Sequence, residues 1–224
     1  MRVLLILLTA LAICFFFYLY PQIDLVVSSF FYHNGFYLKD TIFAKIIYKL
    51  TIIILAIFGI GTLGLLLFEI VTKKEIIKKK ILIYLLLSLL LGPGLLVNVV
   101  FKNHFGRARP SQIHYFGGSK KFTPAGVITH ECKKNCSFTS GHAAAAFYFL
   151  ALVPLFRSKK RYLVALLALL WGSIVGFVRI IQGGHFLSDV VCSAVAVFGV
   201  SYIVYILMFE RKNNEAIGSN TSNE

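Results

Sequence analysis

Charged residues and long polar stretches are scarce in this sequence of 224 residues. Asp, Glu, Lys and Arg make up 14% of it, whereas hydrophobic residues make up 58%. A soluble domain is only about 45–50% apolar, so this composition excludes an ordinary soluble enzyme and indicates an integral membrane protein. We find no internal repeat and no long linker. We therefore expect one membrane domain over residues 1–211 and a polar, disordered tail over residues 212–224.

Cysteine is also scarce, with four residues in the chain. Cys14 and Cys192 lie within apolar runs, where a cysteine behaves as a small buried hydrophobe. Cys132 and Cys136 belong to the stretch "ECKKNC" between two apolar runs. If this loop lies outside the cytoplasm, we expect a disulfide, with a pair of free thiols as the alternative.

Residues that could bind a metal are not spaced as ligands. No second cysteine pair accompanies "ECKKNC", and the histidines form no HxH or HxxxH pair. Zinc sites in proteins use such pairs, so the sequence predicts no metal site. The histidines considered for an alternative metal site are His33, His104, His114 and His130.

Long apolar runs dominate what is present. They predict an all-α fold, a bundle of six transmembrane helices, because a spanning helix needs about 20 apolar residues. The first run is expected to be a retained span and not a signal peptide. The runs are Val3 to Tyr20, Leu50 to Thr72, Ile81 to Phe101, Ala143 to Phe156, Tyr162 to Val178 and Val190 to Phe209.

Basic residues in short connectors predict the orientation of these spans. The two densest short connectors join spans two and three and spans four and five, on the side that also carries both termini. Cytoplasmic connectors are enriched in Lys and Arg, so we expect cytoplasmic termini. The basic residues of the two connectors are Lys73, Lys74, Lys78, Lys79, Lys80, Arg157, Lys159, Lys160 and Arg161.

Polar residues at the ends of four spans should meet on the opposite face. Each could be an interfacial anchor taken singly, since cations and histidines are common at helix ends. Their convergence on one face favours a site instead. They are Lys102 and Arg109 after span three, Ser140, Gly141 and His142 before span four, Arg179 at the end of span five, and His185 and Asp189 before span six.

A phosphate group would suit this set of residues. Lys102 and Arg109 are seven positions apart, about two helical turns, so both could point the same way if the helix continues that far. Arg179 offers a planar fork for two phosphate oxygens. Ser140 and Gly141 start a helix, where unpaired backbone N–H groups attract an anion.

Two histidines and one carboxylate supply the chemistry. Asp189 lies four residues after His185, on the same helix face, and can fix the ring so that its other nitrogen attacks phosphorus. His142 could protonate the leaving oxygen. We therefore predict a phosphomonoesterase that needs no metal. Arg107 is expected at the rim of this site, and Lys120, Lys121, Lys133 and Lys134 are expected to be solvated.

Three stretches resemble the signature of the type 2 phosphatidic acid phosphatase family. "KNHFGRARP" is similar to K-x6-R-P, "TSGH" to P-S-G-H, and "VRIIQGGHFLSD" to S-R-x5-H-x3-D, in the family's order. The resemblance implies a phosphohistidine on His185, oriented by Asp189, with His142 as general acid and no cofactor. It also implies that Lys102, Arg109, Arg179, Ser140 and Gly141 hold the phosphate. Thr139 and Val178 depart from the pattern, which has proline and serine there.

Within this family, "GPGLLVNVVFKNHFGRARP" and "QGGHFLSDVV" are similar to bacterial lipid A phosphatases, especially those that remove the 4'-phosphate. This resemblance implies a bilayer and a phosphorylated membrane lipid as partners, with no nucleic acid. It places the site at the periplasmic face of the bacterial inner membrane. Loss of lipid A phosphate would lower the negative surface charge and weaken the binding of cationic antimicrobial peptides.

Other functions remain open at this stage. Phosphatidylglycerophosphate and undecaprenyl diphosphate present a phosphate at the same face, and the loop from Ser111 to Asn135 could select among these lipids. An anion transporter is disfavoured because the ionisable residues lie at one end of the spans and not at the midplane. An inactive scaffold is disfavoured by the presence of both histidines, Asp189 and the cations.

Overall fold

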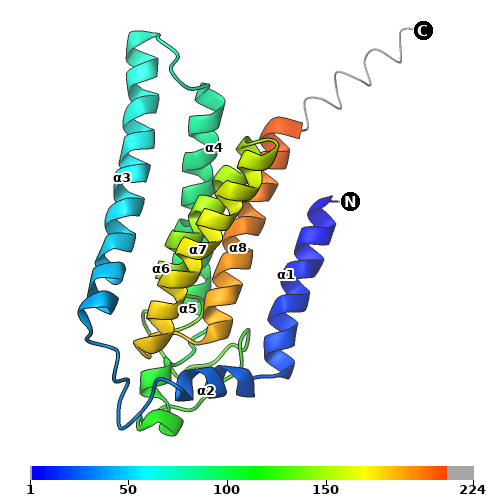
Figure 1. Cartoon of the computed structure of the whole chain (residues 1–224). Helices are drawn as coiled ribbons and strands as arrows, with labels where there is room; N and C mark the ends of the chain where they lie inside the picture. The colour runs from blue at the N-terminus through cyan, green and yellow to red at the C-terminus, as the bar shows by residue number, and fades with distance from the viewer. Residues whose placement is uncertain (1, 211–224) are drawn as a thin grey trace.

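The computed structural model describes residues 2–210, and within them the fold is helical and contains no β-strand. The prediction of an all-α protein is confirmed. The predicted tail over residues 212–224 lies outside the described residues. The long helices run along one axis, and α2 lies across one end of the molecule (Figure 1).

In chain order the helices are α1 (Arg2–Leu19), α2 (Gln22–Ser29), α3 (Ile42–Thr72), α4 (Lys79–Leu89), the π-helix η1 (Leu90–Phe101), α5 (Lys102–His104), the 3-10 helices η2 (Pro110–Gln112) and η3 (His114–Phe116), α6 (Gly141–Phe147), the 3-10 helix η4 (Tyr148–Leu155), α7 (Lys159–Ile181), α8 (Leu187–Tyr205) and the π-helix η5 (Ile206–Glu210).

Among the described residues, four helical stretches are long and apolar enough to cross a membrane: Ile42–Thr72, Lys79–His104, Lys159–Ile181 and Leu187–Glu210. The pair α1 and α2 adds a fifth candidate, although the two helices are bent by 73°. The apolar stretch Gly141–Leu155 is shorter than a full span. The chain is thus a membrane protein, and the count of six spans stays a prediction.

Helix α8 lies at the centre of the bundle and packs against α1, α4, α6, η1 and η4. Two buried tyrosines lock α4 to the α6–η4 segment: the Tyr84 hydroxyl donates to the Ala151 carbonyl at 2.7 Å, and the Tyr148 hydroxyl donates to the Leu85 carbonyl at 2.8 Å. Helix α7 approaches α6 closely at Gly172, where a Cβ would lie 2.1 Å from the Phe147 ring. This packing fixes the ends of α6, α7 and α8 relative to one another.

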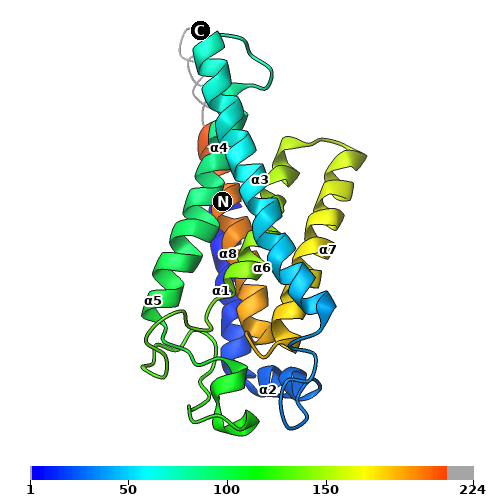
Figure 2. The same ribbon diagram turned by 90° about the vertical axis from the view of Figure 1, so that its left-hand side faces the viewer.

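One end of the bundle is covered by α2 and by the long loop between α5 and α6 (Figure 2). Cys132 and Cys136 form a disulfide in this loop, as predicted. Helix α3 begins at Ile42, eight residues before the predicted start of its span, with Thr41 as its N-cap. The additional turns bring Lys45, Tyr48 and Lys49 onto α3 at this same end.

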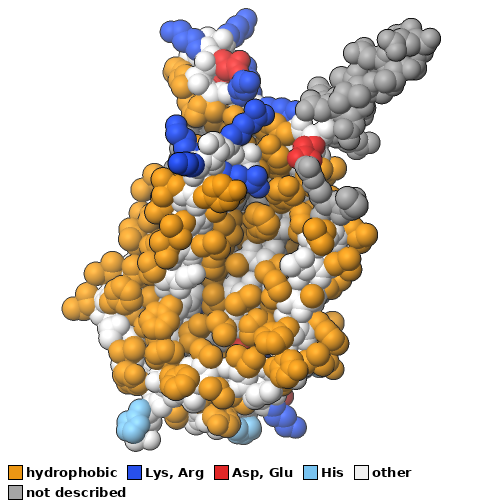
Figure 3. All heavy atoms as spheres, turned by 45° about the vertical axis from the view of Figure 1, so that its right-hand side comes forward, with side chains coloured by type: hydrophobic (Ala, Val, Ile, Leu, Met, Phe, Trp, Pro, Cys, Tyr) orange, Lys and Arg blue, Asp and Glu red, His pale blue; other side chains and the backbone are white. Residues whose placement is uncertain are grey.

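Apolar side chains cover most of the visible surface between the two ends of the molecule (Figure 3). Lys and Arg side chains gather at the end that carries the connection between α3 and α4 (Figure 3). This distribution agrees with a belt in contact with lipid tails and a basic end in contact with headgroups and water.

Candidate active site

His185 and Asp189 stand at the start of α8, at the covered end of the bundle. His185 precedes the helix and is 1% exposed, and Asp189 in the first turn is fully buried. The His185 Nδ1 atom lies 2.7 Å from the Ser137 carbonyl oxygen and 3.7 Å from Asp189 Oδ2. The ring therefore donates from Nδ1 to the Ser137 carbonyl, which leaves the lone pair on Nε2.

Asp189 reaches His185 mainly through Ser137. The Ser137 hydroxyl donates to Asp189 Oδ2 at 2.5 Å, and the Phe186 backbone N–H donates to the same oxygen at 2.9 Å. Ser137 thus contacts the histidine with its carbonyl and the carboxylate with its hydroxyl. Burial lowers the pKa of His185 to about 4, so the ring is neutral near pH 7.

Arg107 is not at the rim, and that prediction is wrong. Its side chain is 1% exposed, and Nη1 donates to Asp189 Oδ1 at 2.7 Å. Nη2 donates to Asp24 Oδ2 at 2.8 Å, and the guanidinium lies 4.3 Å from the Phe186 ring centre. Burial alone would lower the pKa of Arg107, but the Asp189 and Asp24 carboxylates raise it above its ordinary value.

His142 is the second residue of α6 and lies close enough to His185 to interact with it. Its ring stacks on Tyr48 of α3, with 3.9 Å between ring centres. Within the described residues the His142 Nε2 atom is buried and has no hydrogen-bond partner. A buried ring nitrogen needs a partner, so a substrate oxygen would satisfy it. Tyr48 also lies 5.0 Å from the Arg179 guanidinium, so it contacts two site residues.

Lys102, Arg109 and Arg179 all lie close enough to His142 to act on its charge. Helix α5 ends at His104, so Arg109 does not continue the helix of Lys102, contrary to the helical spacing considered above. Asn135 brings the two together: Lys102 Nζ donates to its side-chain oxygen at 3.2 Å and Arg109 Nη2 to its carbonyl at 2.9 Å. Arg179, at the end of α7, donates from Nη1 to the Gln182 side chain.

Ser140 and Gly141 directly precede His142 at the start of α6. The Ser140 hydroxyl accepts from the Ala143 backbone N–H at 3.4 Å, so this residue is the N-cap of α6. At Gly141 a Cβ would meet Asn98 Oδ1 at 2.7 Å and Lys102 Nζ at 3.0 Å. Glycine therefore permits the close approach of Lys102 to the backbone that precedes His142.

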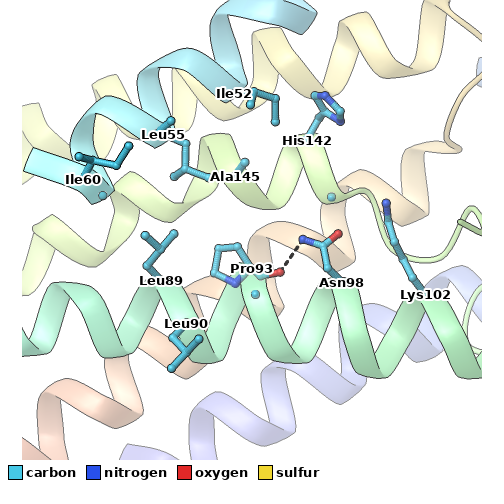
Figure 4. Close-up of a pocket in the computed structure, with 14 residues that line it drawn as sticks. Ile52, Leu55, Ile60, Leu89, Leu90, Pro93, Asn98, Lys102, His142 and Ala145 are labelled. Carbon is cyan, nitrogen blue, oxygen red and sulfur yellow. Dashed lines mark hydrogen bonds between the residues drawn. The ribbon is translucent and has the colours of Figure 1, made fainter. Parts of the chain in front are cut away.

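Two hollows adjoin the site. An apolar groove of about 560 Å³ runs between α3, α4–η1 and α6, and Figure 4 shows His142, Asn98 and Lys102 at one end and Ile60, Leu55 and Leu89 toward the other. A polar pocket of about 350 Å³ borders Tyr48, Arg109 and Arg179. Its other lining residues are Lys39, Asp40, Lys45, Lys49, Ser111, Gln182 and Gly184.

The predicted site residues thus come together, and the sequence analysis missed several of their partners. Asn135 and Ser137 had no signal beyond their place just before "TSGH", and Tyr48, on α3, had none. Asp24 had one, because a carboxylate inside the apolar stretch "PQIDLVV" needs a buried partner. Among residues 2–210 no group of three or more His, Cys, Asp or Glu side chains is placed to hold a metal ion.

The chain is similar to a known protein family and to several known proteins. Residues 81–213 match the PAP2 superfamily. The chain is 36% identical over 217 residues to the lipid A 4'-phosphatase of Francisella tularensis subsp. novicida (strain U112). This match covers 90% of this chain and 95% of that protein. It is also 40% identical over 131 residues to the lipid A 4'-phosphatase of Rhizobium leguminosarum. That match covers 57% of this chain and 56% of that protein.

No solved structure matches the chain. The matched family segment includes η1, α5 to α8 and every predicted site residue. Together with the membrane-spanning helices, the family and its relatives identify a membrane-bound phosphoric monoester hydrolase. The chain therefore belongs to the PAP2 superfamily.

Proposed function

We propose that this protein removes the 4'-phosphate of lipid A through a phosphohistidine intermediate on His185. The observation that carries the proposal is the hydrogen bond from His185 Nδ1 to the Ser137 carbonyl, at 2.7 Å. It fixes the tautomer with the lone pair on Nε2, in a site that also contains three cations and a second histidine. A neutral, oriented imidazole is a competent nucleophile for phosphorus.

In the first step, the Nε2 lone pair attacks phosphorus and the bond between phosphorus and the ester oxygen breaks. The electron pair leaves with that oxygen, and His142 donates a proton to it. The phosphate dianion favours the protonated form of His142, because an opposite charge stabilises the imidazolium. Lys102, Arg109 and Arg179 stabilise the negative charge on the other phosphate oxygens, with Ser140 and Gly141 beside them.

In the second step, water attacks the phosphorus of the phosphohistidine. His142, now neutral, accepts a proton from this water, and the bond between phosphorus and Nε2 breaks. The electron pair returns to Nε2, so inorganic phosphate leaves and His185 is neutral again. The residues therefore complete the cycle with no redox change, and the proposed enzyme uses no cofactor or metal.

The two hollows support a lipid substrate with a polar headgroup. The groove is lined mainly by apolar residues of α3, α4–η1 and α6 and reaches His142 and Lys102, so an acyl chain would lie there. The polar pocket on the other side of Tyr48 would receive the headgroup. The names of the relatives favour lipid A over other phosphorylated lipids.

We propose further that the chain forms six spans in the bacterial inner membrane, with both termini in the cytoplasm. The stretch Gly141–Leu155 would then be the short span and the bent pair α1–α2 the first one. The basic connectors after α3 and before α7 support this orientation, because Lys and Arg are enriched on the cytoplasmic side. The site then faces the periplasm, where lipid A dephosphorylation would reduce the binding of cationic antimicrobial peptides.

The direct test is phosphate release by the purified protein in detergent with excess chelator. Lipid A, phosphatidylglycerophosphate and undecaprenyl diphosphate are supplied side by side, with His185→Ala as the control. We expect release from lipid A, loss of only the 4'-phosphate by mass spectrometry, and no release by the variant.

Other results would revise the proposal in defined ways. Faster release from either of the other two lipids would contradict the lipid A assignment and leave the mechanism standing. Release by His185→Ala at a rate near that of the wild type would remove His185 as the nucleophile. Activity that chelator abolishes and one divalent ion restores would contradict a metal-free reaction.

A further inference from the structure

A buried ionic network joins the N-terminal helix pair to the candidate nucleophile. Asp24 on α2 is fully buried, and its Oδ2 atom accepts from Arg107 at 2.8 Å and from the Ser188 hydroxyl at 2.5 Å. Arg107 donates from its other terminal nitrogen to Asp189 at 2.7 Å. The path continues through Ser137, whose hydroxyl donates to Asp189 and whose carbonyl oxygen accepts from His185.

The start of α8 is held by both carboxylates. Asp24 Oδ1 accepts from the Ser188 backbone N–H at 2.8 Å, and Asp189 Oδ2 accepts from the Phe186 backbone N–H at 2.9 Å. Two carboxylates therefore satisfy N–H groups at one helix N-terminus, where negative charge is favourable. Because His185 directly precedes this turn, any movement of the network would move its imidazole.

Charge in the network is not balanced. Both oxygens of Asp24 accept hydrogen bonds, as those of an ionised carboxylate do. Asp24 and Asp189 then carry two negative charges, and Arg107 supplies one positive charge, all at or below 1% exposure. The excess negative charge adjoins a ring that gains positive charge when it attacks phosphorus. A fixed countercharge in a buried site lowers the energy of such a transition state more than it would in water.

Anchoring of α2 alone is a weaker explanation of this network. A buried ion pair gives little net stability over packed apolar side chains, because both charges lose their hydration. An apolar residue at position 24 would anchor a helix in a membrane protein without that cost. The free-energy cost of burying these charges is explained if the network also takes part in the reaction.

We infer that Arg107 and Asp24 are positioning residues, which act on His185 through Asp189 and Ser137 to hold the imidazole and to set the charge behind it. This inference rests on the proposed phosphohistidine mechanism. It assigns a role in the site to α2, which lies outside the segment that matches the superfamily.

Several other charged groups also act on His185 and must stay constant in a test. Arg179 of α7 and Arg109 of the loop oppose its protonation, Asp189 of α8 favours it, and His142 of α6 lies close enough to interact. Lys102 of α5 acts on His142, and Tyr48 of α3 contacts Arg179. The variants below leave all six unchanged.

The test compares kcat, KM and the pH dependence of kcat/KM for phosphate release from lipid A by four variants. Arg107→Met removes the positive charge, Arg107→Lys keeps the charge but loses the fork, and Asp24→Asn removes one negative charge. Glu69→Gln is the matched control, because Glu69 is a fully buried carboxylate that accepts two backbone N–H groups at the far connection between α3 and α4. Thermal unfolding in detergent shows which variants are folded.

We expect kcat to fall about 10- to 100-fold in all three network variants, with KM changed less than about threefold, as for residues that orient a reacting group from behind. In Arg107→Met the acid limb of kcat/KM should move up by about one pH unit, because the remaining carboxylates favour protonated His185. In Asp24→Asn and Arg107→Lys the acid limb of kcat/KM should not move up, because neither variant adds net negative charge to the network. Glu69→Gln should keep the wild-type kcat and acid limb.

Folded variants with wild-type kcat and an unshifted acid limb would overturn the inference and leave the proposed function intact. If all three network variants lose kcat equally and the acid limb of kcat/KM in Arg107→Met does not shift, the network is only a structural anchor and the inference is wrong. If Arg107→Met does not fold, the kcat of Arg107→Lys and Asp24→Asn decides by itself. An inactive wild type, or an active His185→Ala, would instead overturn the proposed function on which the inference rests.

Discussion

The two histidines of the site are held in different ways, and neither is held through its Nε2 atom. His185 is held through Nδ1 by the Ser137 carbonyl, and His142 is held through its ring face by Tyr48. Neither contact occupies the Nε2 atom of its ring. The two side chains therefore differ in environment, which is how two residues of one type can take different roles.

If His142 is the general acid, its loss should lower kcat/KM most for substrates whose leaving oxygen needs a proton. We expect His142→Ala to reduce kcat/KM about 10²- to 10⁴-fold for a sugar or alkyl phosphate. The loss should be much smaller for an aryl phosphate with a good leaving group. Steady-state rates for a series of esters measure this difference, with Tyr48→Phe as a control that preserves the stacked ring. Equal losses across the series would contradict the role of His142.

The sequence could predict that the motif residues lie at one end of the bundle, because each adjoins the end of an apolar run. Their roles stay predictions. The place of Arg107 could not be predicted, because its direction depends on the turn at Gly106. That residue has φ = +58°, and a Cβ there would lie 1.8 Å from the Thr129 carbonyl oxygen. The turn follows the end of α5 at His104 and directs Arg107 inward, so its spacing of two residues from Arg109 wrongly predicted a place at the rim.

Among the elements, α3 contributes more to the site than its apolar run suggested. Its first turns carry Tyr48 beside His142, and its middle forms one wall of the groove (Figure 4). The early start at Ile42 was missed because Lys45 and Lys49 interrupt the apolar run there. Helix α2 was missed because eight residues are too few for a clear pattern, and its key contact is with Arg107, 83 positions away.

Filling the groove should separate lipid binding from chemistry. Ala56 of α3 lines it, and Ala56→Trp should raise KM for a lipid phosphate about tenfold, while a short water-soluble phosphate ester keeps its kcat/KM. The matched control is Leu169→Trp on the outer face of α7, where the leucine is 47% exposed. Michaelis constants for both substrates provide the measurement. Equal effects of the two tryptophans on the lipid would argue against the groove as the acyl site.

At the scale of the whole molecule, the two ends differ in what they carry. One end has the connections rich in Lys and Arg, and the other has α2, the disulfide loop and the candidate site (Figures 1 and 3). Hydropathy and charge predicted the apolar belt and the basic connectors, because both follow directly from contact with lipid and water. The packing of α1 and α2 against α8 depends on side-chain fit and had no comparable signal in the sequence.

Cysteine labelling in intact cells tests the proposed orientation. Tyr115 of η3 is 64% exposed at the site end, and Ile76 is 63% exposed at the opposite end. In a background with Cys14→Ala and Cys192→Ala, Tyr115→Cys should react with a membrane-impermeant thiol reagent at the cell surface once the outer membrane is permeabilised. Ile76→Cys should react only after the inner membrane is broken. The reverse order would place the site in the cytoplasm.

The central claim, covalent catalysis by His185, is tested most directly by trapping the intermediate. The protein is mixed with lipid A labelled in the 4'-phosphate, in excess chelator, and denatured in base within milliseconds. We predict a base-stable, acid-labile phosphate on the peptide that contains His185, formed and lost at rates that account for turnover and absent from His185→Ala. Phosphate release at the normal rate with no label on that peptide would contradict the claim.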